Sequence, residues 1–227
     1  MKHKPLQKNG GVGEQPKDNV LFIIADNLSA TLGCFGVEGV STPNIDKLAS
    51  RGLKFNQAYS QASLCNPSRA SIMTDRRPDN LRIWSNDLQF GDIHPKIATL
   101  PEHFKTNGYH TIGIGKIFHN WGQSIKGNPR SWSEPEQYNW AVHYQDWYIK
   151  SKPYQLHSDI PKGPAVQAAD VTDEAYLDGR IAGAAVSKLK ELIETPFFLA
   201  VGFWKPHLPF NTPKNIGTYM TVILYQR

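Results

Sequence analysis

The sequence is poor in cysteine, because only Cys34 and Cys65 occur among its 227 residues. Two cysteines exclude a disulfide framework and a metal site built from four cysteines. Cys34 has the apolar neighbours Leu32 and Phe35, so we expect a buried structural thiol at this position. Cys65 precedes a run that contains a proline and an arginine, and it is therefore the candidate for cysteine chemistry.

Long apolar runs are also absent. No stretch approaches the roughly 18 apolar residues that a helix needs to span a bilayer, so we expect no membrane span. Residues 1–18 are polar and lysine-containing, without the apolar segment of a secretory signal peptide. We therefore expect no signal peptide in this chain and a disordered N-terminus over residues 1–18, and the cellular location stays unknown.

Neither sign of charge is in large excess. The 25 lysines and arginines outnumber the 20 aspartates and glutamates by five, and hydrophobic residues make up 40% of the chain. This composition is typical of a globular protein. So mild a basic balance, without zinc-finger spacings, predicts no nucleic-acid partner. It suits an enzyme that attracts polyanionic substrates.

Apolar runs of strand length alternate with helical patterns along the chain. This alternation predicts an α/β fold with a mostly parallel central sheet flanked by helices. The first run has no polar interruption, so we expect a strand that is buried on both faces. The predicted strands are 19–25, 53–59, 109–115 and 197–203, and the predicted helices are 42–52, 67–73, 99–107 and 171–194.

Three of the predicted strands end beside polar residues. Asp26 and Asn27 follow the first strand, Lys116 follows 109–115, and His207 comes shortly after 197–203. Chemistry in such sheets gathers beyond the carboxyl ends of the strands. We therefore expect these side chains to converge on one site.

Each of these residues also has an ordinary structural interpretation. Asp26 and Asn27 offer oxygens to a hard divalent cation, or they form a turn or a helix cap. Lys116 could neutralise an anion and His119 could transfer a proton, or they are a solvated lysine and a capping histidine. His207 could act as a general acid, or it is a loop histidine.

The run Cys65-Asn66-Pro67-Ser68-Arg69 places a potential nucleophile at the entrance of a predicted helix. Backbone N–H groups and the dipole at such a position favour an anion, and Arg69 could reach back to pair with it. The alternative is a core cysteine next to a surface arginine.

The extended run from Cys65 to Pro78 resembles the maturation signature of the type I sulfatases, and most closely the group around iduronate 2-sulfatase and its bacterial relatives. Other segments resemble the same family in the same order, and the resemblance covers about residues 19–214. They are Asn19–Asp26, Leu32–Gly36, Thr42–Ala49, Gly108–Tyr109, Gly115–His119, Pro196–Gly202 and Lys205–Phe210. The resemblance implies the alkaline-phosphatase-like α/β fold and hydrolysis of sulfate esters of sugars.

The resemblance also implies roles for individual residues. A dedicated maturation enzyme would oxidise Cys65 to formylglycine, whose hydrate attacks sulfur. Asp26, Asn27 and residue 65 would hold a divalent cation, usually calcium, with magnesium as the alternative. The other implied roles concern the reacting groups: Arg69 steadies the hydrate, Lys116 neutralises sulfate, His119 helps to collapse the sulfated intermediate and His207 donates a proton to the leaving oxygen.

The sequence departs from the family pattern at four places. Asn27 replaces an aspartate, Asp75 replaces a glycine of the extended signature, and Trp204 replaces a histidine of the human-type enzyme. Residues 19–214 correspond to the N-terminal part of the catalytic domain, so we expect the C-terminal part to be missing. Residues 215–227 lose the resemblance, which predicts an aberrant, frameshifted tail.

Three functions stay open at this point. The first is a sulfatase that acts on a sulfated sugar. The second is a truncated, non-catalytic remnant or a binding module for sulfated glycans. The third is a phosphate-ester hydrolase of the same superfamily, which would present serine or threonine in place of Cys65.

Overall fold

The computed structural model describes residues 17–119, 128–138, 166–192 and 195–216. Most of the predicted disordered terminus and most of the predicted aberrant tail lie outside these residues. Within the described part of the chain, no helix combines the length and the apolar character that crossing a membrane requires.

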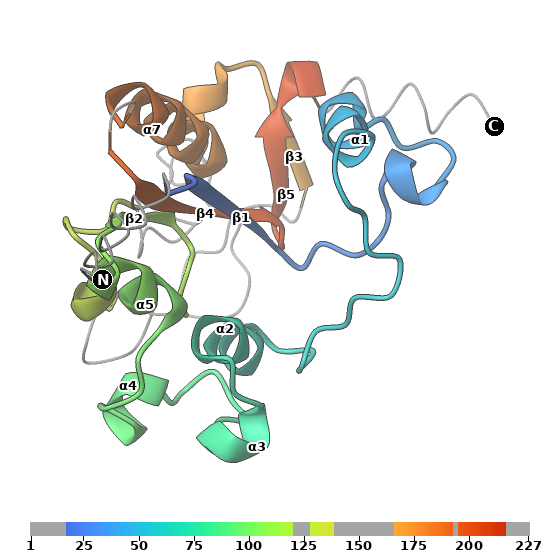
Figure 1. Ribbon diagram of the computed structural model, residues 1–227. Helices are drawn as coiled ribbons and strands as arrows, with labels where there is room; N and C mark the ends of the chain where they lie inside the picture. The colour runs from blue at the N-terminus through green and yellow to red at the C-terminus, as the bar shows by residue number, and fades with distance from the viewer. Residues whose placement is uncertain (1–16, 120–127, 139–165, 193–194, 217–227) are drawn as a thin grey trace, which may run out of the picture.

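A parallel three-stranded sheet forms the centre of the described structure (Figure 1). Its strands are β1 (Val20–Asp26), β2 (His110–Gly115) and β4 (Phe197–Pro206), in the order β1-β4-β2. Three of the four predicted strands are therefore confirmed, and so is their parallel arrangement. β4 ends at Pro206, which is three residues after its predicted end at residue 203.

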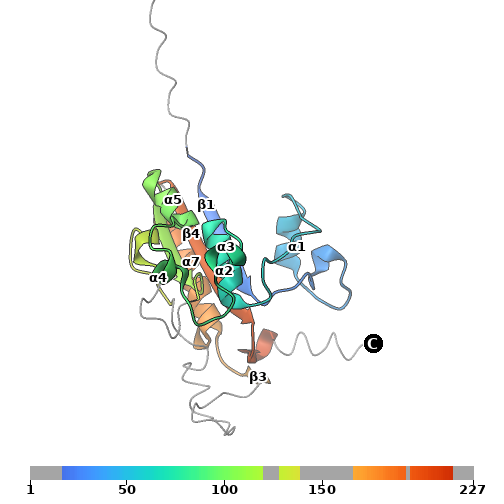
Figure 2. The same ribbon diagram turned by 90° about the horizontal axis from the view of Figure 1, so that it is seen from below.

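Helices cover both faces of this sheet (Figures 1 and 2). The helix α7 (Leu177–Glu191) lies on one face, and α2 (Cys65–Thr74) and α5 (Leu100–Thr106) lie on the other. The side chains of β4 alternate between two cores. Phe198 and Ala200 join a core with α2, whereas Leu199 and Val201 join a core with α7.

The starts of the three main helices can be compared with the predicted ones. Thr99 and Glu102 form a capping box at the start of α5, and Gly108 follows its end with a φ of +81°. Helix α2 begins at Cys65, two residues before its predicted start at Pro67. Helix α7 begins only at Leu177, because residues before it form a turn and a short helix.

Strand β1 contradicts the expectation of burial on both faces. It lies at the edge of the sheet, and its residues alternate between partly buried and exposed. Leu21 and Ile23 are 45% and 54% exposed. An apolar run shows that a strand could be buried, but it cannot show whether a second layer of structure covers the outer face.

The segment between β1 and α2 differs from the prediction in three more respects. Residues 53–59 form no strand and are exposed. Cys34 is only half-buried, so its thiol is not a core group. The predicted helix 42–52 forms as α1 (Pro43–Ala49) and ends three residues early. Its Ile45 and Leu48 are 43% and 68% exposed, because α1 packs mainly on the neighbouring short helix and not on the sheet.

A second, two-stranded parallel sheet was not predicted. It pairs β3 (Val166–Ala169) with β5 (Phe210–Pro213). Both strands have only four residues, which is too short for a periodic pattern to stand out. The remaining short helices are η1 (Gly33–Phe35), α3 (Pro78–Leu81), α4 (Phe90–Ile93), η2 (Pro129–Ser131) and η4 (Asp173–Ala175).

Phe198 in the central strand should carry a large share of the packing energy. It is 1% exposed, and its ring stacks on Phe104 of α5 with centroids 4.6 Å apart. We expect Phe198→Ala to lower the free energy of unfolding by about 3–5 kcal/mol, because it leaves a cavity in a closed core. The exposed control Leu48→Ala should change it by less than about 0.5 kcal/mol. Urea unfolding measures both, and equal effects would contradict the assigned core.

Candidate active site

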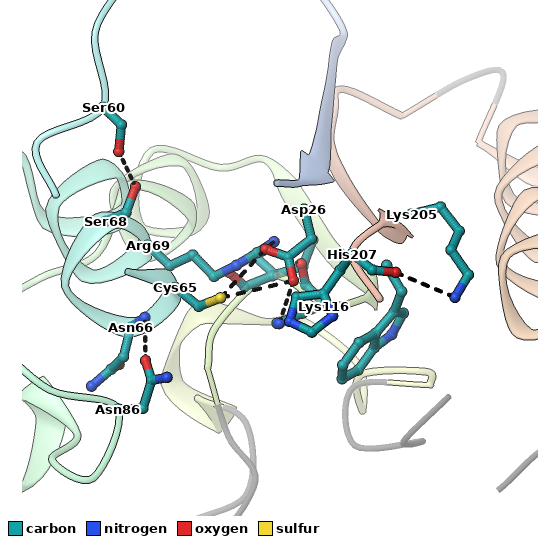
Figure 3. A network of polar contacts seen from close by, with 12 residues as sticks. Asp26, Ser60, Cys65, Asn66, Ser68, Arg69, Asn86, Lys116, Lys205 and His207 are labelled. Carbon is teal, nitrogen blue, oxygen red and sulfur yellow. Dashed lines mark hydrogen bonds and ion pairs between the residues drawn. The ribbon is translucent and has the colours of Figure 1, made fainter. Parts of the chain in front are cut away.

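The residues that sequence analysis singled out converge at the carboxyl ends of the parallel strands (Figure 3). Asp26 is the last residue of β1, and Lys116 follows the last residue of β2. His207 follows β4, and Cys65 is the first residue of helix α2, which faces this edge of the sheet. The expected convergence of the strand ends is confirmed.

The carboxylate of Asp26 is the centre of this arrangement. It is 4% exposed and accepts hydrogen bonds from two buried cations. The Arg69 guanidinium donates to Oδ1 over 3.1 Å, and the Lys116 ammonium donates to Oδ2 over 2.5 Å. The thiol of Cys65 contacts the same carboxylate, and its Sγ lies 3.7 Å from Oδ1 and 3.9 Å from Oδ2.

The charge state of Asp26 follows from these neighbours. Burial alone would raise the pKa of its carboxyl, but the positive charges of Arg69 and Lys116 and their hydrogen bonds outweigh the burial. The pKa of Asp26 therefore lies below its ordinary value, and this carboxyl is ionised at neutral pH. One negative charge faces two positive charges, so the cluster carries a net positive charge.

Arg69 links helix α2 to the end of β2. Besides Asp26, its guanidinium donates to the backbone carbonyl of Lys116 and to that of Ile117, the latter over 3.1 Å. It is 3% exposed, which excludes the alternative of a surface arginine. A planar group with several donors suits this role, because it satisfies a carboxylate and two carbonyls at once.

Lys116 is buried as well and is not the solvated lysine of the alternative interpretation. It is 4% exposed, and its ammonium lies 4.5 Å from the ring centroid of Trp204. A cation over an indole face is stabilised by the ring quadrupole. Trp204 therefore contributes to the site, although no pattern in the residues around it indicated a cation–π contact.

His119 is buried next to these charges and does not cap a helix. It is 6% exposed, and neither ring nitrogen has a hydrogen-bond partner among the described residues. Burial, helped by the charges of Lys116 and Arg69, lowers the pKa of His119 to about 4. Its imidazole is therefore neutral at pH 7 and can accept a proton.

His207 is half-buried and lies near the thiol and the carboxylate. One ring nitrogen of His207, the Cys65 sulfur and an Asp26 oxygen all lie within 4.8 Å of one another. Its Nδ1 is 2.6 Å from the carbonyl oxygen of Leu208. A carbonyl only accepts, so Nδ1 carries the hydrogen, and Nε2 gains a hydrogen only in the imidazolium form.

The start of helix α2 is different from the expected anion site. Most of its first backbone N–H groups cannot receive a ligand: Asn66 donates to the Asn86 side chain over 3.1 Å, Pro67 has no N–H, and Ser68 donates to the Leu64 carbonyl. The positive character near Cys65 comes mainly from Arg69 and Lys116. The side chain of Asn86, which lies 20 residues from its partner, could not be identified from the local sequence.

An open cavity of about 440 Å³ adjoins Cys65. Asp26, Asn27, Ser68 and Arg69 also line it, whereas Lys116, His119 and His207 are not among its lining residues. Asn27 is exposed and has a φ of +62°, a conformation that asparagine tolerates better than most residues. The cavity gives a small ligand access to the sulfur and to the carboxylate.

The oxygen donors fit a hard divalent cation in kind but not in number. Asp26 offers a carboxylate and Asn27 an amide oxygen, and the other nearby donors are the Cys65 thiol and a His207 nitrogen. Calcium takes six to eight oxygen ligands and magnesium six. The described residues therefore provide part of a hard-cation site, whose remaining oxygens would have to come from elsewhere.

The charge at position 27 should set the affinity for calcium. We expect Asn27→Asp to bind calcium several-fold to about tenfold more tightly than the unchanged chain, because a second carboxylate adds a negative charge next to Asp26. Isothermal titration with calcium chloride measures both affinities. Asn80→Asp adds the same charge away from the cavity and is the control. Equal affinities for the unchanged chain and the Asn27→Asp variant would contradict a ligand role for this position.

The buried imidazole of His119 should make the metal-free protein less stable in acid. The unfolded chain takes up a proton near the ordinary pKa of 6.5, whereas the folded chain takes it up only near 4. The unfolded state therefore binds more protons between these values, and the stability contributed by His119 falls as pH is lowered through this window. In urea unfolding from pH 7 to pH 4.5, the unchanged chain should lose stability relative to His119→Gln as the pH is lowered. Parallel curves of stability against pH would show that His119 is not buried as a neutral ring.

Comparison with known proteins assigns this chain to a family. The sequence profile of the family named Sulfatase matches residues 18–221. The chain is 38% identical to human iduronate 2-sulfatase over 202 residues, which is 87% of this chain and 36% of that protein. It is 32% identical to a sulfatase of Formosa agariphila, over 89% of this chain and 41% of that protein.

A solved structure gives the same answer for the fold. A protein described as a 2-O GAG sulfatase superimposes with a TM-score of 0.57 at 26% identity, over 85% of this chain and 36% of that one. The chain thus spans 36–41% of the length of these three relatives. Because the family profile matches nearly the whole sequence and the fold agrees, this chain belongs to the sulfatase family.

Proposed function

We propose that this chain forms the nucleophile-bearing part of a sulfuric ester hydrolase that removes sulfate from a sulfated sugar. The observation that carries the proposal is that Cys65 lines a cavity and that its sulfur lies within 4 Å of the Asp26 carboxylate, which binds two buried cations. A sulfate ester needs a nucleophile and positive charge at the same place, and this cluster offers both.

The nucleophile would be a modified Cys65. In this scheme a maturation enzyme, with the help of an oxidant, removes the sulfur and leaves the aldehyde of formylglycine, which adds water to become a diol. One hydroxyl of the diol attacks the ester sulfur, and the bond between sulfur and the sugar oxygen breaks. The second hydroxyl then loses its proton, sulfate leaves, and the aldehyde forms again. The diol needs no further nucleophile from the chain.

The described residues are placed to support these steps. Lys116 and Arg69 supply positive charge where negative charge develops on sulfate oxygens. His119, whose imidazole is neutral at pH 7, can take the proton that the diol gives up. His207 lies within 4.8 Å of the Cys65 sulfur and, as an imidazolium, can protonate the sugar oxygen that leaves.

A divalent cation would add a Lewis acid to this site. We assign calcium, with magnesium as the alternative, to Asp26, Asn27 and residue 65, since a hydrated aldehyde would replace the soft thiol with two oxygens. Such a cation would polarise a sulfate oxygen and make the attacking hydroxyl more acidic.

The relatives suggest the class of substrate. One is an iduronate 2-sulfatase and another is described as a 2-O GAG sulfatase. Both descriptions name sulfated sugars, so a sulfated carbohydrate of this kind is the substrate that we propose, together with a formylglycine-generating enzyme as the maturation partner.

A second candidate function is a non-catalytic binding module for sulfated glycans. It is favoured by one observation, namely that the described residues supply only part of a hard-cation site. A module of this kind would still bind an anionic sugar through Arg69 and Lys116, but it would not turn it over. A phosphate-ester hydrolase is less favoured, because such enzymes present serine or threonine where this chain has Cys65.

The modification of Cys65 tests the proposal directly. After co-expression with a formylglycine-generating enzyme, we expect the peptide with residue 65 to lose about 18 Da relative to the cysteine form. Cys34 in the same digest is the internal control and should remain an alkylatable thiol. If both cysteines are alkylated equally, the proposed nucleophile is wrong. Turnover of 4-nitrophenyl sulfate by the modified chain, with Cys65→Ala as the blank, then separates an enzyme from a binding module.

A further inference from the structure

A second groove lies beside the candidate active site, on the far side of the segment 60–64. This groove has a volume of about 530 Å³. Ala62, Ser63 and Leu64 line both this groove and the cavity at Cys65. The two spaces are therefore neighbours that share one wall, and a ligand of two or more linked rings could occupy both.

We propose that this groove binds an anionic sugar unit next to the one whose sulfate lies at residue 65. The inference rests on the proposed function for the identity of the first sugar, but the groove itself is defined by Trp84, Arg77 and Asp79. We refer to these three residues and the shared wall 62–64 as the Trp84 groove.

Trp84 provides a flat apolar surface in this groove. Its side chain is 62% exposed, although the preceding residue, Ile83, is fully buried and anchors the chain. The indole N–H donates to the Asp79 carboxylate over 3.4 Å, which helps to fix the orientation of the ring. An exposed, oriented indole that packs into no core can stack on the C–H face of a pyranose ring, as aromatic side chains do in carbohydrate sites.

Arg77 provides the charge. It lines the groove and is exposed, and neither it nor the exposed neighbours Arg76 and Arg82 forms an ion pair within the described part of the chain. A guanidinium presents paired donors that match a carboxylate or a sulfate. Asp79 is the one carboxylate among the described residues that line the groove, and besides accepting the indole N–H it can accept hydrogen bonds from sugar hydroxyl groups. The combination favours a ring that carries both hydroxyls and an anionic group.

A chain of sugars fits this groove better than a small aryl sulfate does. The sulfate at Cys65 would occupy the first cavity, and a single ring there would not extend beyond the wall 62–64. The neighbouring ring of an oligosaccharide would reach Trp84 and Arg77. The Trp84 groove should therefore strengthen the binding of an oligosaccharide without changing the chemistry at Cys65.

Binding is measured in the Cys65→Ala background, so that no turnover can occur. The probe is a fluorescently labelled heparin hexasaccharide, followed by anisotropy. We expect Trp84→Ala to weaken binding about tenfold, which corresponds to the loss of one stacked ring, and Arg77→Gln to weaken it several-fold and to reduce its dependence on salt. Trp84→Phe keeps an aromatic face and should retain most of the affinity.

Matched controls separate this groove from general attraction to a basic protein. Phe55→Ala removes another exposed aromatic ring, and Arg51→Gln removes another exposed arginine; both should bind as the unchanged chain does. A fully desulfated, N-acetylated hexasaccharide should bind more weakly, with a smaller effect of Arg77→Gln. A midpoint of urea unfolding equal to that of the unchanged chain confirms that a variant is folded.

The outcomes distinguish this inference from the proposed function. If Trp84→Ala and Arg77→Gln bind the hexasaccharide with the same affinity as the unchanged chain and the two control variants, the Trp84 groove does not bind a sugar. This conclusion holds whether or not the chain hydrolyses sulfate esters. If these variants lose affinity while modified protein fails to hydrolyse 4-nitrophenyl sulfate, the groove stands and the catalytic proposal fails.

Discussion

The ion pairs on Asp26 hold the rest of the site in place. A buried carboxylate binds two buried cations, one from helix α2 and one from the end of β2. Removing the carboxylate would leave two buried side chains with uncompensated positive charges, and such a loss is costly. Arg69 also binds two backbone carbonyls after β2. The position of the Cys65 sulfur therefore depends on charges contributed by three separate segments of the chain.

The fold explains why these segments meet. β4 is the central strand of the parallel sheet, and its side chains pack alternately against α2 and α7. Parallel strands bring their carboxyl ends to the same edge, so Asp26, Lys116 and His207 become neighbours although they are far apart in the sequence. Asp178 of α7 secures the end of β4 by accepting the backbone N–H groups of Trp204 and Lys205, each over 2.9 Å.

The sequence predicts those features that local patterns control. The apolar runs of β1, β2 and β4 and the helical pattern of residues 99–107 are local, and the positions of these elements are confirmed. Burial depends on partners elsewhere in the chain, so the exposure of Leu21 and Ile23, the burial of Arg69 and the contact between Lys116 and Trp204 could not be read from the residues themselves. The same limit applies to Asn86, whose side chain accepts a hydrogen bond from the backbone N–H of Asn66 at the start of α2.

The edge position of β1 has a consequence for handling the protein. Within the described residues, β1 forms its ladder with β4 alone, so its other side presents backbone donors and acceptors outward beside Leu21 and Ile23. An edge of this kind is a template on which an extended segment of another polypeptide can add as a further strand. Purification yields should therefore depend on protein concentration, and a charged side chain placed at Ile23 would blunt that template.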